Sequence, residues 1–378
     1  MVIPMSVATD HREDQPTEGL AALGWTCDEG DDAGRGRRSR IVRHAVVAIV
    51  TFTIVLGLAA TGSAVYLQSR LGGQVHHIDQ VFAGLDNRPA RGSGAAAHAM
   101  NILVMGTDRR SDAATTGTAA TAPEWIPGAQ RTDTIMVLHL DADRQGATLI
   151  SIPRDSWVYV PGYGMNKINA AFSLAGPSLA VETVERLTAL RIDHLAVVDW
   201  AGLEAITDAV GGVTLTVPRT IADPQNHVVW NRGRQTLDGS QALLYVRQRY
   251  GLPNGDLDRV RRQQVYLASL MRAAMSTLRG HHPFAIYSLL DTITRNVSVD
   301  SGWSADEMRS TLLDLRGMEP RSLNLLTAPV SGFGDEAGQS VVYLDFPANQ
   351  RMWDAVIDDD LDSWTDAHPA APLTGPTS

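Results

Sequence analysis

The sequence predicts a layered α/β domain that follows a single membrane-spanning helix. From residue 101 onward, short apolar runs typical of strands alternate with amphipathic stretches typical of helices, a pattern characteristic of a sheet covered by helices. Residues 45–67 form an unbroken run of 23 residues without a charged side chain, which is long enough to span a bilayer. The hydrophobic content of 44% suffices for a full core, and the single cysteine, Cys27, excludes an intramolecular disulfide.

The region before the apolar run predicts a cytoplasmic tail covering residues 1–44. It is polar and mostly acidic, and we expect it to be disordered, but its last ten residues carry five arginines whereas only Arg70 follows the run closely. The positive-inside rule therefore places the tail in the cytoplasm and the rest of the chain outside the cell membrane. A signal peptide is the alternative, but a tail of this length is too long for one.

Beyond the span, the sequence predicts a spacer over 68–100, one domain over 101–358 and a disordered tail over 359–378. Residues 110–130, rich in Ala, Thr, Gly and Pro, predict a flexible loop. We expect strands at 101–106, 134–140, 147–152, 194–198, 213–217, 243–249, 323–327 and 341–344, and helices at 177–188, 200–210, 257–280, 304–315 and 349–357.

The stretch 245–264 concentrates positive charge in a chain whose net charge is -10. Alternation along the expected strand 243–249 places Arg247 and Arg249 on one face. The stretch holds five arginines: Arg247, Arg249, Arg259, Arg261 and Arg262. Guanidinium groups make paired hydrogen bonds to phosphate oxygens and keep their charge, so such a concentration suits a phosphate-bearing ligand.

The helix expected after this strand carries the other half of the stretch. Arg259, Arg262 and Gln263 have the i, i+3, i+4 spacing that puts them on one helix face. Strand and helix could together aim four guanidiniums and one amide at a single point beside a helix N-terminus, a geometry that fits a pyrophosphate. The alternative is a solvated surface helix with ion pairs to Asp256 and Asp258.

Three Asp–Arg blocks lie at expected strand ends. Asp108 follows one strand, Arg131 and Asp133 precede the next, and Arg154 and Asp155 follow a third. Ligands of open α/β sheets bind outside strand ends. The carboxylates of Asp108 and Asp133 suit a hard cation such as Mg²⁺ that is shared with phosphates, and the two arginines would extend a phosphate clamp. Each block alone also fits a loop-capping ion pair.

Seven blocks of the chain resemble, in their order, the LytR-CpsA-Psr (LCP) family of cell-wall enzymes. They are N-I-L-V-M-G-T-D-R-R, R-T-D-T, S-I-P-R-D-S-W-V, K-I-N-A-A-F, D-A-V-G-G-V, L-D-G-S-Q-A-L-L-Y-V-R-Q-R and D-L-D-R-V-R-R-Q-Q. The resemblance is firm over 101–278 and looser to 358. It implies a layered α/β/α LCP-type domain with a central mixed sheet, and a loop 110–130 that bulges outward, because it is longer than expected in the family.

The resemblance implies a membrane-anchored phosphotransferase. It would move a glycopolymer from a polyprenyl-pyrophosphate carrier to a peptidoglycan hydroxyl, the C6 hydroxyl of N-acetylmuramic acid, and release polyprenyl phosphate. The implied partners are this glycan donor, the peptidoglycan acceptor and the lipid bilayer, with no nucleic acid. The implied cofactor is Mg²⁺ (or Mn²⁺).

The resemblance also implies roles for individual residues. Asp108 and Asp133 match the metal-associated aspartates. The pyrophosphate-binding positions are Arg131, Arg154, Arg247, Arg249, Arg259 and Gln263. Arg262 matches a motif position whose role is less defined and could be structural. Apart from the resemblance, a hydroxyl nucleophile benefits from a general base, and either Asp133 or Asp155 could serve. Lys167 and Asn169 match a block near the pocket.

The lipid tail of such a donor needs an apolar channel. Val265, Leu267, Leu270 and Met271 share a face of the expected long helix and could line it, although such a face is more often ordinary core. Two further functions stay open: hydrolysis of a polyprenyl pyrophosphate with water as the acceptor, and a non-catalytic wall-associated regulator. The short, mostly acidic cytoplasmic tail does not favour a DNA-binding regulator.

Overall fold

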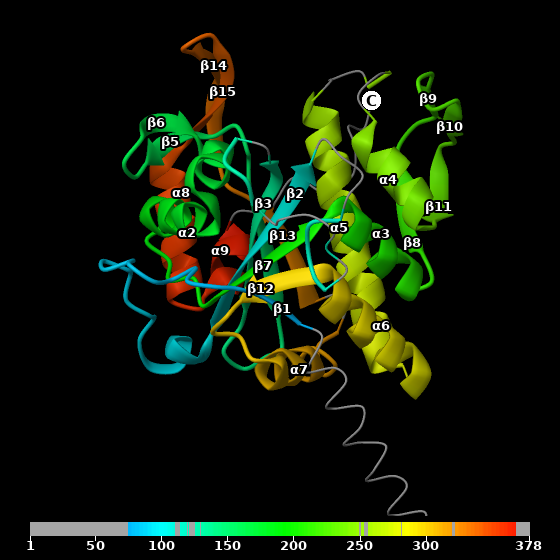
Figure 1. Ribbon diagram of the computed structural model, residues 1–378, viewed down its shortest axis with the longest axis horizontal. Coiled ribbons are helices and arrows are strands. Elements are labelled where there is room, and N and C mark those ends of the chain that lie inside the picture. Colours follow the sequence, from blue (N-terminus) through cyan, green and yellow to red (C-terminus); the bar gives the residue numbers. More distant parts are fainter. Residues whose placement is uncertain are drawn as a thin grey trace, which may run out of the picture. The chain divides into compact units, whose positions relative to one another are not determined.

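The computed structural model describes residues 75–109, 114–118, 120, 125–128, 130–248, 251–252, 256–280, 282–319 and 322–367. The predicted cytoplasmic tail and span, residues 1–67, lie outside these. Within the described ranges, none of the helices combines the length and apolar character that a bilayer crossing requires. The fold is a mixed α/β architecture built around one central sheet (Figure 1).

The central sheet has seven strands in the order β1-β12-β7-β2-β3-β4-β13. Three neighbouring pairs are parallel (β1 with β12, β2 with β7, β4 with β13) and the other three are antiparallel. Consequently the ends of β2, β4 and β7 and the start of β3 fall at the same end of the sheet, which we call the site end. The strands are β1 (His76–Ile78), β2 (Met100–Arg109), β3 (Gln130–Leu140), β4 (Ala147–Ile152), β7 (His194–Asp199), β12 (Val297–Asp300) and β13 (Leu323–Thr327).

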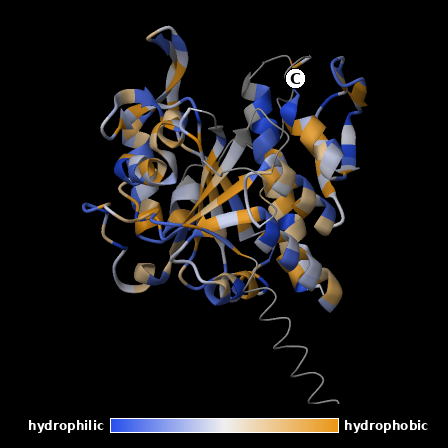
Figure 2. Cartoon of the chain, in the orientation of Figure 1, coloured by the Kyte–Doolittle hydropathy of each residue, from blue (hydrophilic) through white to orange (hydrophobic). Residues whose placement is uncertain are grey.

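Helices cover both faces of the sheet (Figure 1). One core cluster joins strand residues such as Leu103, Ile135 and Ile150 to α2 (Ile168–Thr188), α8 (Phe346–Ile357) and α9 (Leu361–Ala367). Two clusters on the other face join strand residues to α3 (Trp200–Ala209), α4 (Gly239–Arg247), α5 (Asp256–Arg279), α6 (Pro283–Asn296) and α7 (Ala305–Asp314). Figure 2 shows the central strands as strongly hydrophobic, as expected for a sheet buried on both sides.

Short polar side chains cap the N-termini of several of these helices. Asp199 accepts a hydrogen bond from the backbone N of Gly202 at the start of α3. Asp238 of α4 forms a capping box with Gln241, as does Ser304 of α7 with Glu307. Such caps satisfy backbone N–H groups that have no partner inside the helix, and so they set where each helix begins.

Four two-stranded sheets and a short 3-10 helix complete the described part of the chain. Three of the sheets are hairpins, which pair β5 (Trp157–Val160) with β6 (Gly164–Lys167), β9 (Ile221–Asp223) with β10 (Val228–Trp230), and β14 (Val330–Glu336) with β15 (Gln339–Leu344). The fourth sheet pairs β8 (Val213–Val217) with β11 (Gly233–Leu237), and the β9–β10 hairpin lies between these two strands in the chain. The 3-10 helix is η1 (Gly94–His98). The β5–β6 hairpin directly follows the third Asp–Arg block, and so it stands at the site end of the sheet.

The structure corrects the strand expected at 243–249. Residues 239–247 form helix α4, which starts at the capping box of Asp238. The apolar run A-L-L-Y-V is compatible with either structure, and its last two residues, Tyr245 and Val246, are both buried. The cap and the packing against α5 decide in favour of the helix, so the expected alternation of Arg247 and Arg249 on a strand face does not apply.

The compact domain also extends beyond the expected limits of 101 and 358. Residues 76–78 of the expected spacer form β1 and pair with β12, and Val81 is buried in the core. Residues 361–367 of the expected disordered tail form α9, where Leu361 is buried in the same core cluster. Single apolar residues such as these become ordered through tertiary packing, which local composition does not reveal.

Candidate active site

A β-bulge positions Asp133. On β2 and β3, Gly106 pairs with Thr134 and the next residue, Thr107, pairs with Thr132. Asp133 is therefore an extra residue on β3, with no partner opposite it in the ladder. Bulges bend a strand and redirect a side chain, and they are common beside active sites.

Beyond the bulge the two strands continue to the site end of the sheet. Asp108 pairs with Arg131 in this last stretch of the ladder. The backbones of both predicted metal carboxylates thus belong to neighbouring strands at one end of the sheet, as the sequence predicts. The side chains of Asp108 and Arg131 lie outside the described part of the structure.

Four charged side chains form a connected row beside the bulge, which we call the strand-end cluster. The guanidinium of Arg154 contacts Oδ1 of Asp133, and its Nε lies 3.5 Å from Oδ2 of Asp155. The ammonium of Lys167 in turn lies 3.0 Å from Oδ1 of Asp155. All four side chains are largely buried, with exposed fractions between 12% and 25%. The row alternates in charge, so a ligand could exchange with either carboxylate or either cation.

The turn that carries Arg154 and Asp155 is held on two sides. The carbonyl O of Arg154 accepts a hydrogen bond from the backbone N of Asn169, in the first turn of α2, at 3.1 Å. The carbonyl O of Asp155 accepts from the backbone N of Val342 in β15 at 2.9 Å. Rigid support of this kind preorganises charged groups for a ligand or a transition state.

Helix α5 presents its buried face toward the sheet. Arg259, Arg262 and Gln263 share this face and are all buried, which confirms the predicted common face and excludes a fully solvated helix. Gln263 lines a cavity together with Thr107 and Thr134, which lie beside the bulge at Asp133. The predicted amide therefore does reach the site end of the sheet.

Arg262 has a structural role. Its Nη1 donates to Oε1 of Gln248 at 2.6 Å and to the carbonyl O of Tyr245 at 3.2 Å, and its guanidinium lies 4.2 Å from the centre of the Tyr245 ring. Burial lowers the pKa of Arg262 from its ordinary value. These contacts join α5 to the end of α4.

Arg247 is the last residue of α4. It is exposed at the end of α4, with its guanidinium 5.8 Å from the centre of the Trp200 ring. Trp200 also lines the cavity, so Arg247 stands at the margin of this cavity. Arg249 lies outside the described residues. The meeting of four guanidiniums at one point therefore stays a prediction.

The cavity is narrow and mostly apolar. It lies between the sheet and helices α3 and α5, has a volume of about 20 Å³, and is lined by Val104, Val198, Leu203 and Leu267 among others. Leu267 is the member of the expected channel wall that lines it. Leu270 is buried in the core, and Val265 and Met271 pack against core clusters, so three of the four residues belong to ordinary core.

Sequence reasoning missed Asp199 at this end of the sheet. Besides capping α3, its Oδ2 accepts hydrogen bonds from the backbone N and the hydroxyl of Thr115, at 2.5 and 3.1 Å, and the residue lines the cavity. Its position directly after an expected strand, like that of Asp108, was the signal that could have identified it.

The described parts of loop 110–130 pack onto the domain, and this corrects the expectation of a flexible loop that bulges outward. Near its start, the hydroxyl of Thr116 donates to the carbonyl O of Asn296 at 2.8 Å. Near its end, the backbone N of Gly128 donates to the carbonyl O of Ser173 in α2 at 3.0 Å, and Trp125 packs against Gly176. The described segments of the loop are thus held on both faces of the sheet.

Comparison with known proteins gives the family. The LytR_cpsA_psr family model matches residues 62–357. The cell wall biosynthesis protein LcpA of Corynebacterium glutamicum is 34% identical over 334 residues, which cover 79% of this chain and 62% of that protein. The polyisoprenyl-teichoic acid–peptidoglycan teichoic acid transferase TagU of Enterococcus faecalis is 33% identical over 187 residues, covering 49% of this chain and 59% of that protein.

The chain thus spans about three-fifths of the length of these two relatives. The solved structure of a LytR-Csp2A-Psr enzyme from Actinomyces oris has the same fold, with a TM-score of 0.56 at 19% identity, and the match covers 75% of this chain and 96% of that one. Since the family model spans most of the sequence and the fold agrees, this protein belongs to the LytR_cpsA_psr family.

Proposed function

We propose that this protein transfers a glycopolymer from a polyprenyl-pyrophosphate carrier to a peptidoglycan hydroxyl, the C6 hydroxyl of N-acetylmuramic acid, on the outer side of the cell membrane. The observation that carries the proposal is the strand-end cluster of Asp133, Arg154, Asp155 and Lys167, which stands at the same end of the sheet as a mostly apolar cavity. Charged groups beside an apolar space suit a lipid that bears a pyrophosphate. The name of the relative TagU agrees with a reaction of this class.

In this proposal the pyrophosphate binds at the site end of the sheet. Arg154 and the buried Arg259 and Gln263 contact its oxygens, together with Arg131, Arg247 and Arg249. The polyprenyl tail enters between the sheet and α5, where the cavity lies. A volume of about 20 Å³ holds little more than a water molecule, so α5 moves outward, or Leu267 changes rotamer, when the tail enters.

Asp108 and Asp133 would hold Mg²⁺ (or Mn²⁺). Their fit to a hard cation rests on donor chemistry and placement: both are carboxylates, and they stand on neighbouring strands at the bulge. When bound, such a cation neutralises charge on the pyrophosphate oxygens. Asp133 would then share its carboxylate between the cation and Arg154.

The transfer step is an in-line displacement at phosphorus. The acceptor hydroxyl attacks the phosphorus that bears the sugar, a new P–O bond forms, and the P–O bond to polyprenyl phosphate breaks. Asp155 accepts the hydroxyl proton, because its side chain is 25% exposed against 12% for Asp133 and it can meet an acceptor that arrives from outside. Arg154 stabilises the charge on the leaving phosphate.

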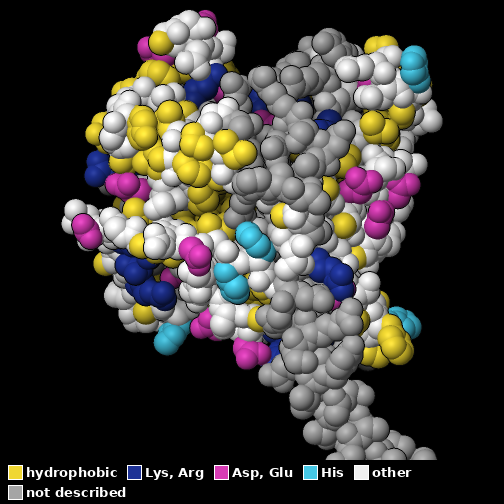
Figure 3. All heavy atoms as spheres, viewed as in Figure 1, with side chains coloured by type: hydrophobic (Ala, Val, Ile, Leu, Met, Phe, Trp, Pro, Cys, Tyr) yellow, Lys and Arg dark blue, Asp and Glu magenta, His cyan; other side chains and the backbone are white. Residues whose placement is uncertain are grey.

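The β5–β6 hairpin offers a surface for the acceptor. Figure 3 shows hydrophobic side chains gathered over α2 and this hairpin. Tyr159 and Tyr163 are half exposed, and the guanidinium of Arg186 lies 5.5 Å from the centre of the Tyr159 ring. Exposed apolar patches mark interaction sites, and this one begins two residues after Asp155. We assign it to the peptidoglycan strand.

The test is acceptor-dependent release of polyprenyl phosphate by the full-length protein in detergent. Arg154→Ala should abolish release, whereas Arg309→Ala, which removes a partly exposed arginine that pairs with Asp306 on α7, should leave it unchanged. Release that is equally fast without acceptor would make the protein a hydrolase. A folded wild-type protein that binds the donor without turnover would support a regulator.

A further inference from the structure

A buried histidine and two carboxylates meet at the end of the sheet opposite the proposed transfer site. His139 stands near the end of β3, Asp141 lies in the turn after it, and Asp359 follows α8. Nε2 of His139 lies 3.0 Å from Oδ1 of Asp359 and 3.8 Å from Oδ1 of Asp141. One ligand atom from each of these residues lies within 4.8 Å of the other two. We call these three residues the His139 cluster.

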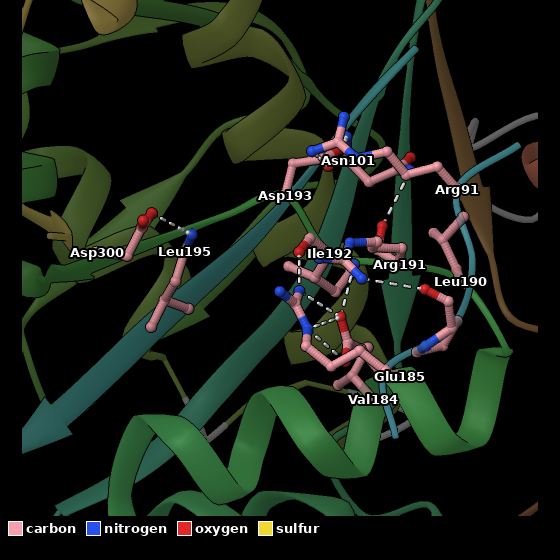
Figure 4. A network of polar contacts seen from close by, with 12 residues as sticks. Arg91, Asn101, Val184, Glu185, Leu190, Arg191, Ile192, Asp193, Leu195 and Asp300 are labelled. Atoms are coloured by element: carbon pink, nitrogen blue, oxygen red, sulfur yellow. Dashed lines mark hydrogen bonds and ion pairs between the residues drawn. The ribbon is translucent and has the colours of Figure 1, made fainter. Parts of the chain in front are cut away.

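The orientation of the imidazole is set by Asn101. Nδ1 of His139 lies 2.8 Å from Oδ1 of Asn101, while Nδ2 of Asn101 donates to the carbonyl O of Arg191 at 3.2 Å. The Asn101 backbone N donates to Asp193 within the polar network of Figure 4. Because the amide oxygen can only accept, Nδ1 of His139 must carry the proton.

This tautomer leaves the lone pair of a neutral ring on Nε2, on the side of the two carboxylates. His139 is 1% exposed, and Asp141 and Asp359 are partly buried. Three groups that can each supply a ligand atom therefore face one another at short range, an arrangement that a cation between them would stabilise.

The geometry points to a divalent transition-metal site, and we propose that His139, Asp141 and Asp359 bind one Zn²⁺ or an ion of similar preference. Ligands at about 2.0–2.1 Å around a tetrahedral Zn²⁺ stand about 3.4 Å apart. The separations of 3.0 and 3.8 Å lie on either side of this value. An imidazole whose other nitrogen donates to a fixed oxygen is the usual arrangement of a histidine ligand.

The backbone around the His139 cluster is shaped to bring these ligands together. Asp359 has a left-handed φ of 57°, and the backbone N of Ala142 donates to its Oδ2 at 3.2 Å. Gly146 has no side chain, which leaves the space that the Asp141 carboxylate occupies. The ion would join β3 to the segment after α8, which is 220 residues away in the chain. Its role would be to hold α8 and α9 against the sheet.

The His139 cluster is independent of the proposed transfer site. Asp133 and His139 stand six residues apart on β3, about 20 Å at the rise of an extended strand. An imidazole ligand favours Zn²⁺ or a similar ion over Mg²⁺. A substitution in the His139 cluster should therefore remove the metal bound there and leave any metal at the proposed transfer site in place.

The test is titration of the chelator-treated full-length protein with Co²⁺, which absorbs visible light strongly when four-coordinate, and with Zn²⁺ followed by thermal unfolding. We expect one equivalent to bind and to raise Tm. Asp359→Asn should weaken binding by about 100-fold or more, since the loss of an outer-shell partner alone costs up to that factor. Asparagine tolerates the left-handed conformation, so this variant should still fold. Asp141→Asn should behave in the same way.

Two controls isolate the His139 cluster. Asp143→Asn removes the same charge from an exposed position in the same turn, and Asp133→Asn removes the proposed transfer-site ligand; both should retain the full Co²⁺ signal. Equal binding by wild type and Asp359→Asn would overturn the proposal, as would a folded wild type that binds no ion. A Tm that changes with pH but not with added metal would also overturn the proposal. The contact between His139 and Asp359 would then be a hydrogen bond with a shared proton.

Discussion

The ammonium of Lys167 lies 3.0 Å from Oδ1 of Asp155, so the chain's single lysine is joined to the turn after β4. The guanidinium of Arg154 in the same turn contacts Asp133 on the bulged strand. The bulged strand β3, the turn after β4 and the end of the β5–β6 hairpin are thereby connected through charge at one end of the sheet. Lys167 also precedes α2 directly, so its backbone position is set by this helix.

Replacing this lysine should therefore impair transfer more than folding. We expect Lys167→Gln to lower the transfer rate on the order of 10²-fold, because a displaced Asp155 no longer meets the acceptor hydroxyl correctly. Lys167→Arg, which keeps the charge, should recover part of the rate. The measurement is polyprenyl phosphate release at saturating donor; an unchanged rate in folded Lys167→Gln would separate this residue from the reaction.

The buried Arg262 should matter for stability. Arg262→Met leaves Oε1 of Gln248 and the carbonyl O of Tyr245 without this donor, and we expect a loss of about 2–3 kcal/mol in the free energy of unfolding. Arg272→Met, on an exposed position of the same helix, should change it by less than about 0.5 kcal/mol. Denaturant unfolding of both variants provides the comparison, and equal effects would refute the structural role.

The contact between Trp125 and Gly176 can be isolated with a pair of glycine variants. Gly176 has a φ of 76°, and an added Cβ would lie 3.0 Å from Cδ2 of Trp125. Gly164 has a similar φ of 75°, but its Cβ would meet nothing within 4 Å. Backbone strain should cost each Ala variant about 1–3 kcal/mol.

Gly176→Ala should lose about 1–3 kcal/mol more than Gly164→Ala, because of overpacking. The difference in their thermal unfolding measures the Trp125 contact. If the two variants are equally stable, loop 110–130 does not hold Trp125 against α2 in solution.

The capping box of α7 should make stability depend on acid pH. Hydrogen bonds from the backbone N and the hydroxyl of Ser304 hold the pKa of Glu307 below its ordinary value. The stabilisation is therefore fully present above the unfolded-state pKa and is lost as the pH falls through the folded-state value. Ser304→Ala should cost about 0.5–2 kcal/mol at pH 7.

The same variant should also show a smaller fall in Tm between neutral and acid pH than wild type does. Thermal unfolding across this range checks the sign, and a steeper fall in the variant would contradict the assignment.

Local sequence predicted the parts of the fold that depend on short-range pattern. The expected strands at 134–140 and 147–152 lie within or coincide with β3 and β4, because continuous apolar runs are required where a sheet is covered on both faces. Pro177 does begin a helical segment, since Ala175 and Gly176 before it have non-helical backbone angles. The three Asp–Arg blocks likewise stand at strand ends.

Other parts depended on contacts between distant residues. Nothing local marks the bulge at Asp133, which arises from the register of two strands. The run before Arg247 fits a strand or a helix, and the Asp238 cap together with the packing against α5 selects the helix. Thr115 is buried because Asp199, 84 residues later, accepts its hydrogen bonds. The spacing of Lys167 and Asp155 in the sequence likewise does not predict that they form an ion pair.

The strand order affects how the chain folds during synthesis. Four adjacent strands of the sheet, β7, β2, β3 and β4, come from residues 100–199. In contrast, β13 pairs with β4 only after residues 323–327 exist, and β1 has no partner until β12 is made at 297–300. Pairing between such distant segments is slow because a long loop must close first. Between the synthesis of β7 and that of β12 and β13, the nascent chain therefore carries a partial sheet with two open edges, the state most exposed to aggregation and proteolysis.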